Sequence, residues 1–193
     1  MRGYDAGLSA VRYPRDDVSP RFGEAPPFEL GKARCLTPDL DVQQGHTPDV
    51  AVLAFGTPAV AAMVAAEELA SEYRVAVYDA RFAKPVDAEL VRSLLTAGIP
   101  VVTAEDHSIV GGFGSAVLES AQEQGLDASR VHRAGLPDSW VYQNSRTKQL
   151  AEVGLDAAGL ARAIRAAADG TPAAATPPAK TEPKPHAHEP AGR

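Results

Sequence analysis

The sequence predicts an α/β fold of three layers, in which a mainly parallel sheet carries helices on both faces. Short apolar runs alternate with helical patterns along most of the chain. Strands that alternate with helices in this way form the crossover units of a parallel sheet. Residues 50–55 are apolar without interruption, which is typical of a strand buried on both of its faces.

The first half of the chain predicts three strands and one helix. Gly56, Thr57 and Pro58 combine turn, N-cap and helix-start signals, so an alanine-rich helix should begin directly after them. The expected elements, in order, are a strand at 28–37, a polar loop at 38–48, a strand at 50–55, a helix at 59–71 and a strand at 75–78.

The second half continues the alternation and then becomes helical only. Asp87 is placed to cap a helix whose leucines and valines recur at helical spacing, and Gly98 ends that helix. Ser115 is the expected cap of the next helix, and Asp156 that of the last one. The remaining expected elements are a strand at 99–103, a helix at 115–124, a strand at 130–134, a helix at 145–153 and a helix after 156.

The composition argues against several classes of protein. A net charge of −6 with scattered basic residues is unfavourable for nucleic-acid binding, which requires a basic face to neutralise phosphates. No apolar run reaches the roughly 20 residues that span a bilayer, and residues 1–9 lack the apolar core of a signal peptide. We therefore expect a cytoplasmic protein that binds neither nucleic acid nor membrane.

The loop after the strand at 99–103 is the expected functional edge, because ligands and partners of an open α/β sheet meet the carboxyl ends of its strands. Glu105, Asp106 and His107 stand there, and a carboxylate beside a histidine is a familiar acid/base arrangement. Consecutive residues that leave a strand point in different directions, however, and the chain has no Gly-x-Ser-x-Gly elbow. We interpret the three as a solvated loop or an interface, with catalysis as the alternative.

A glycine-rich turn follows at residues 111–115, Gly-Gly-Phe-Gly-Ser. At a helix start, such a turn can bind an anion through its backbone N–H groups. The turn lacks the Lys-Ser/Thr ending of a P-loop and does not follow the first strand of a dinucleotide fold. Tight turning explains these glycines better than anion binding does.

Two further segments are candidate interfaces. Residues 78–87 combine charges with Phe and Pro, so Asp79, Arg81 and Phe82 form either an internally paired connection or an interface edge. Trp140 follows the last expected strand, and aromatic residues dominate subunit contacts. Packing of Trp140 onto its own domain is the alternative.

The single cysteine, Cys35, excludes an internal disulfide and any multi-cysteine metal site. We interpret it as a packed thiol rather than a nucleophile. Residues 169–193 are rich in Pro and Ala and contain almost nothing large and apolar, so we expect them to be disordered. Two histidines in that segment, His186 and His188, are too few for a metal site.

Several motifs in register resemble the carboxyl-terminal part of the 1-deoxy-D-xylulose-5-phosphate synthase family, which has a transketolase-like C-terminal domain. The resemblance runs from about residue 7 to residue 168, and the Arg-Tyr-Pro-Arg motif and Gly-Leu-Asp ending fit this family better than the β subunits of 2-oxo-acid dehydrogenases. The motifs lie at residues 12–15, 28–33, 49–57, 79–87, 105–115, 135–138 and 154–160.

The resemblance implies a reaction that this chain cannot perform alone. The family uses thiamine diphosphate and magnesium to join pyruvate, with loss of CO2, to glyceraldehyde 3-phosphate, and the product feeds isoprenoid, thiamine and pyridoxal synthesis. Its metal and diphosphate ligands are a Gly-Asp-Gly turn and a downstream Asn, but this chain has no Gly-Asp-Gly and its only Asn is Asn144. We therefore expect no cofactor, no metal and no synthase activity in this chain by itself. By resemblance, Arg15 would contact the substrate phosphate, which suits a guanidinium.

We divide the chain into a remnant of the end of a pyrimidine-binding domain (1–18), a linker (19–27), a transketolase C-terminal-like domain (28–168) and a disordered tail (169–193). The resemblance then implies a C-terminal domain or split subunit whose partner is a chain with the thiamine-diphosphate domains, or a second copy in a homodimer. The alternatives are a non-catalytic dimerisation or regulatory module and a degenerate fragment.

Overall fold

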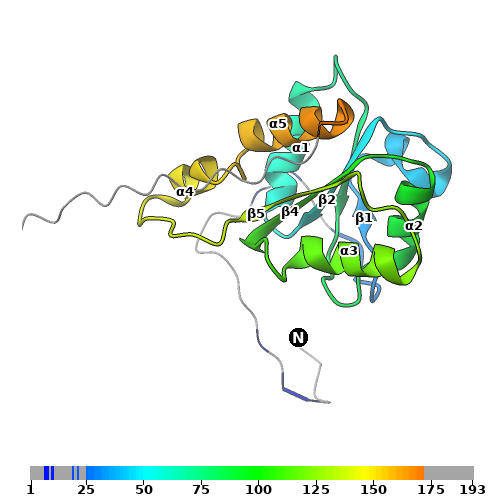
Figure 1. The fold of residues 1–193 in the computed structure, drawn as a ribbon, viewed down its shortest axis with the longest axis horizontal. Helices are drawn as coiled ribbons and strands as arrows, with labels where there is room; N and C mark the ends of the chain where they lie inside the picture. Colours follow the sequence, from blue (N-terminus) through cyan, green and yellow to red (C-terminus); the bar gives the residue numbers. More distant parts are fainter. Residues whose placement is uncertain (1–6, 9, 11–18, 20, 22–24, 172–193) are drawn as a thin grey trace, which may run out of the picture.

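The computed structural model describes residues 7, 8, 10, 19, 21 and 25–171. Most of the predicted remnant at 1–18, including Arg15, lies outside these residues, as does the predicted tail from residue 172 onward. The described part confirms the α/β class with three layers (Figure 1).

The sheet has five strands in the order β1-β3-β2-β4-β5. The four longer strands run parallel, and β1 pairs antiparallel with the edge of β3. The strands are β1 (Arg34–Cys35), β2 (Val50–Phe55), β3 (Val75–Asp79), β4 (Val101–Ser108) and β5 (Val131–Leu136). Because the long strands are parallel, their carboxyl ends form one edge of the sheet.

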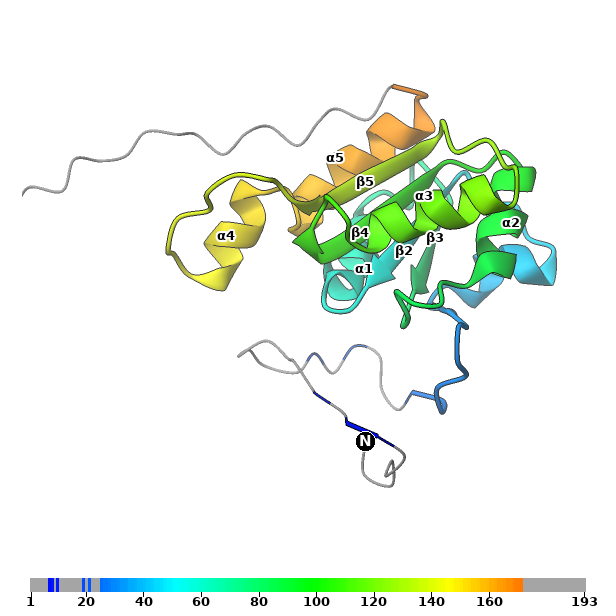
Figure 2. The same ribbon diagram turned by 60° about the horizontal axis from the view of Figure 1, so that its bottom comes forward.

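Two pairs of helices cover the two faces of the sheet. Helices α1 (Pro58–Glu68) and α5 (Ala157–Ala168) pack on one face, and α2 (Ala88–Thr96) and α3 (Phe113–Glu123) on the other (Figures 1 and 2). The short helix α4 (Arg146–Glu152) extends beyond the carboxyl edge of the sheet, outside the three layers.

Alternating side chains of the central strands supply two separate cores. On β2, Val50, Val52 and Ala54 face α1 and α5, whereas Ala51 and Leu53 face α2 and α3. All five are buried, at 2% exposure or less. The prediction of a strand buried on both faces is therefore confirmed, and the fully apolar run follows from covering each face with helices.

The first predicted strand, at 28–37, is wrong for most of its length, because β1 contains only two residues. The chain turns at Gly31 (φ 72°). Beyond the short pairing of β1 with β3, side-chain hydrogen bonds also hold this segment. Thr37 accepts from the backbone N–H of Val77, and the Tyr78 hydroxyl donates to Asp41 (3.2 Å). The predicted polar loop at 38–48 contains two short 3-10 helices, Pro38–Leu40 and Val42–Gln44.

The strand predicted at 99–103 ends too early, and the helix predicted after it begins too late. Strand β4 continues to Ser108, and α3 begins at Phe113 with Gly112 at its N-cap. Ser115 therefore lies inside the helix and is not its cap. The caps predicted at Asp87 and Asp156 are confirmed, since each carboxylate accepts a backbone N–H of the first turn of its helix.

Stability should fall on acidification partly because of His132 on β5. The side chain is 7% exposed, and desolvation, with a smaller contribution from Arg130, lowers the pKa of its imidazole. As pH falls through the ordinary histidine value of about 6.5, the unfolded chain takes up the proton before the folded chain does. The contribution of the neutral His132 imidazole to folding stability is therefore complete above that pH and is lost as the pH falls below it. Thermal unfolding at about pH 7.5 and 5.5 should show a smaller loss for His132→Gln than for the wild type.

His46 provides a matched control for this measurement, because its side chain is exposed. His46→Gln should retain the pH dependence of the wild type. Equal losses in His132→Gln and the wild type would contradict the assignment.

Candidate functional site

The carboxyl edge of the sheet brings together the ends of four strands. Phe55 ends β2, Asp79 ends β3, Ser108 ends β4 and Leu136 ends β5. In open α/β sheets this edge is where ligands and partners bind, and all the candidate residues within 25–171 lie on or beside it. Phe55 also stacks on Phe113 at the start of α3, with ring centroids 5.3 Å apart.

Glu105 is buried at this edge and serves the start of α3. Its side chain is 1% exposed, and its carboxylate accepts the backbone N–H groups of Phe113 (2.6 Å) and Gly114 (2.8 Å). A buried carboxylate requires such partners, and a helix N-terminus is a favourable place for a negative charge. The start of α3 therefore compensates the charge of the buried Glu105 carboxylate.

Gly112 makes room for this carboxylate, and Gly135 and Gly114 make room for groups close to it. A Cβ at Gly112 would lie 2.1 Å from Glu105 Oε2, and one at Gly135 would lie 3.2 Å from Glu105 Cγ. A Cβ at Gly114 would meet Thr103 Oγ1 at 2.5 Å. The glycine-rich turn thus seats an anion that belongs to the protein itself, because the N–H groups expected to hold an external anion are occupied.

Asp106 faces the other way and binds α4. Its carboxylate accepts from Arg146 Nη1 at 2.7 Å, and Arg146 Nη2 donates to Thr57 Oγ1, at the start of α1, at 2.9 Å. One guanidinium therefore connects the end of β4, the start of α1 and the start of α4. The sequence analysis missed Arg146. A signal was present, since a cation in the first turn opposes the helix dipole and suggests a compensating carboxylate.

His107 is exposed, and the predicted loop at 105–107 is part of β4. Alternation along the strand separates the three side chains, with Glu105 at α3 and Asp106 at Arg146. The three side chains therefore form no Glu-Asp-His acid/base unit in this structure.

Arg81, just after β3, lies at the centre of a second cluster of contacts. Its guanidinium carbon lies 4.8 Å from the centre of the Phe28 ring, and Nη1 and Nη2 make long hydrogen bonds of 3.5 Å to the carbonyls of Pro27 and Pro26. Arg81 Nε lies 3.6 Å from Asp79 Oδ2. Phe82 meets Phe28 edge to face at 5.9 Å. The structure therefore brings together Asp79, Arg81 and Phe82, as an internally paired group that holds residues 26–28.

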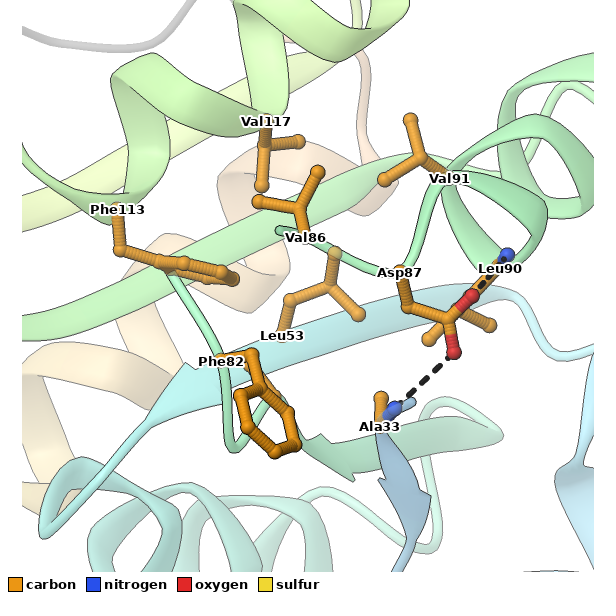
Figure 3. A pocket seen from close by; sticks show the side chains of 10 residues that line it. Ala33, Leu53, Phe82, Val86, Asp87, Leu90, Val91, Phe113 and Val117 are labelled. Atoms are coloured by element: carbon orange, nitrogen blue, oxygen red, sulfur yellow. Dashed lines mark hydrogen bonds between the residues drawn. The ribbon is translucent and has the colours of Figure 1, made fainter. Parts of the chain in front are cut away.

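A small cavity lies behind Phe82, between the sheet and helices α2 and α3 (Figure 3). Its volume of about 10 Å³ corresponds to roughly one water molecule, which excludes an organic ligand. Asp87 on its wall accepts from the backbone N–H groups of Ala33 (3.0 Å) and Leu90 (3.0 Å). This carboxylate ties the segment before β1 to the start of α2.

Trp140, the predicted subunit contact, is 82% exposed and lies in the connection between β5 and the protruding α4.

Cys35, the predicted packed thiol, is half-buried. Its Sγ lies 3.8 Å from Thr37 Oγ1, and desolvation raises the pKa of the thiol. A raised pKa disfavours the thiolate, so Cys35 is a packed thiol and a poor nucleophile.

The described residues do not fit the cofactor of the resembling family. Within them no group of three or more His, Cys, Asp or Glu side chains is placed to hold a metal ion. At the glycine-rich start of α3, the backbone N–H groups of Phe113 and Gly114 are occupied by Glu105. Among the described helices, none is long and apolar enough to cross a membrane.

Replacing Glu105 by Gln should destabilise the domain by about 2 kcal/mol, because charged hydrogen bonds of this kind are worth roughly 1.5–3 kcal/mol. A glutamine side chain also presents an N–H to one of the two backbone N–H donors. Urea unfolding would measure the change, with Glu119→Gln on the exposed face of α3 as control. A stability equal to that of the control would contradict the role assigned to Glu105.

Removing the Asp106 carboxylate should loosen the connection before α4. Partly exposed ion pairs are worth up to about 1 kcal/mol, so Asp106→Ala should raise the rate of chymotryptic cleavage after Trp140 by about two- to fivefold. The neighbouring His107→Ala is the control, because its exposed side chain takes no part in the Arg146 contact. Equal rates in the two variants would show that the ion pair does not hold α4.

Comparison with known proteins identifies the family. Residues 40–160 match the family described as transketolase, C-terminal domain. A 1-deoxy-D-xylulose-5-phosphate synthase from Rhodopirellula baltica is 40% identical over 160 residues, which cover 83% of this chain and 24% of that protein. The 1-deoxy-D-xylulose-5-phosphate synthase 1 of Geobacter sulfurreducens is 42% identical over 174 residues, covering 88% and 26% respectively. The chain thus spans about a quarter of the length of the curated relatives that it matches.

A solved structure agrees with this result. The protein titled "Split gene transketolase, inactive beta4 tetramer" is 32% identical and superposes with a TM-score of 0.60 over 74% of this chain and 44% of its own. Its title describes both a split gene and a tetramer of β chains. On the match to residues 40–160, this chain belongs to the transketolase C-terminal domain family, and the curated relatives that it resembles are 1-deoxy-D-xylulose-5-phosphate synthases.

Proposed function

We propose that this chain is the carboxyl-terminal subunit of a split 1-deoxy-D-xylulose-5-phosphate synthase of the cytoplasm. The complete enzyme would use thiamine diphosphate and magnesium to condense pyruvate with glyceraldehyde 3-phosphate, releasing CO2, for isoprenoid and thiamine synthesis. The observation that carries the proposal is the combined similarity to synthases, at 40% identity for the Rhodopirellula protein, and to a split-gene transketolase, at 32% identity and a TM-score of 0.60.

The cofactor and its metal would bind to the partner chain. Supporting this, the carboxylates at the carboxyl edge are engaged within the domain, Glu105 at α3 and Asp106 at Arg146. What this domain offers is a rigid surface, and its role is to support the partner. From the Arg-Tyr-Pro-Arg motif we further assign Arg15, outside the described residues, to the substrate phosphate in the assembled enzyme.

Self-association is the second candidate. The split-gene transketolase with a similar fold is described as an inactive tetramer of β chains, and Trp140 and Phe28 are large apolar side chains exposed at 82% and 72%. Under this second candidate, the chain forms an inactive homo-oligomer when its partner is absent.

Native purification of the tagged chain from its own cells tests the proposal. We expect a second chain with thiamine-diphosphate domains, identified by mass spectrometry, to copurify. The eluate should form product from pyruvate and glyceraldehyde 3-phosphate, whereas this chain made alone should form none.

Omission of thiamine diphosphate from the assay is the control and should abolish the activity. Recovery of the chain alone, with no activity in the eluate, would contradict the split-synthase proposal. A dose-dependent change in the activity of an intact synthase on addition of the purified chain would favour a regulatory module instead.

A further inference from the structure

Phe28 is held firmly although most of its surface is exposed. Its side chain is 72% exposed, yet Arg81 stacks on the ring at 4.8 Å and Phe82 meets it edge to face at 5.9 Å. An exposed aromatic residue with no function gains little from such support. A rigid exposed ring is, however, the arrangement that binds a partner at low entropic cost.

The residue that supports the ring has an unusual backbone. Arg81 has φ of 58°, a left-handed conformation that is unfavourable for a residue with a side chain. Its side chain is 5% exposed, and its buried Nε makes no hydrogen bond among the described residues. Such local strain persists where the surroundings enforce it, and it is frequent at functional positions.

Residues 26–33, which we call the strap, are fixed along their length. Besides Arg81, Lys32 pairs with Glu89 of α2, and Asp87 accepts from the N–H of Ala33 at 3.0 Å. Gly31 approaches Pro85 so closely that a Cβ there would lie 3.1 Å from Pro85 Cγ. The strap therefore presents Leu30, 73% exposed, beside Phe28 as a second apolar side chain in a defined position.

The position of the strap in the chain indicates what covers it. The family matched is a C-terminal domain, and the synthase relatives are about four times as long as the matched region. In those relatives the preceding domains therefore lead into this domain through the residues equivalent to the strap. A chain that supplies those domains would lie against the same surface.

We propose that Phe28 and Leu30, held in place by Arg81, form the docking surface for the chain that carries the thiamine-diphosphate domains. This inference rests on the proposed function, whose partner chain it places at the strap. Phe28 is the anchor, and Arg81 is the positioning residue that fixes the ring before the partner arrives.

The test uses the tagged chain and the copurifying thiamine-diphosphate chain, mixed as separately purified proteins. Phe28→Ala should weaken their dissociation constant at least tenfold, as expected for an anchor residue. Arg81→Gln should weaken it less, because the ring remains but loses its support. Tyr142→Ala, which removes an exposed aromatic side chain outside the strap, should change it less than twofold.

Thermal unfolding of each isolated variant separates docking from folding. Phe28→Ala should keep a cooperative unfolding transition well above the temperature of the binding assay, so that its weakened binding cannot arise from an unfolded domain. Equal binding by Phe28→Ala and the wild type would overturn the docking surface while the split synthase stands. Failure of the wild type to bind any thiamine-diphosphate chain would overturn both. The wild type could instead form a homo-oligomer that Phe28→Ala dissociates. In that case the partner at the strap is a second copy of this chain, and the assignment to a thiamine-diphosphate chain is overturned.

Discussion

The burial of one carboxylate determines the shape of the carboxyl edge. Glu105 lies in the core at 1% exposure, and an unpaired charge there would cost several kcal/mol. The start of α3 supplies two N–H groups, which requires the helix to begin directly against the strand. Gly112 follows from this contact, because Glu105 occupies the space that a Cβ would need, whereas Gly114 is required by Thr103. The length of β4, the glycine-rich turn and the position of α3 are thus consequences of one interaction.

Asp87, at the end of the loop after β3, is a second carboxylate that accepts backbone N–H groups. Asp87 caps α2 and at the same time accepts from Ala33, ahead of β1. Asp106 joins β4 to α4 through Arg146. The acidic residues of this edge therefore connect elements that the sheet ladder does not connect. Side chains engaged in this way contribute rigidity to the carboxyl edge.

Sequence reasoning succeeded where short-range physics decides the outcome. Strand β2 was identified because its apolar run requires two covered faces, and the caps at Asp87 and Asp156 because the carboxylate and its N–H partner are three residues apart. It failed where distant residues compete with local ones. Glu105 displaced Ser115 as the partner of the α3 start, and no local pattern could show that a buried carboxylate lies there. Phe28 was assigned to a strand, whereas Arg81, more than fifty residues later, holds it at the surface.

The same competition explains why the two carboxylates and the histidine at 105–107 form no acid/base group. An acid/base group must reach a substrate, but Glu105 and Asp106 are both held by backbone and side-chain partners of their own domain. Freeing either one would require the loss of an interaction that orders α3 or α4. Selection for a rigid edge and selection for a reactive carboxylate are therefore opposed at these positions. The fold resolves this opposition in favour of rigidity, which suits the proposed role of this domain as the support of another chain.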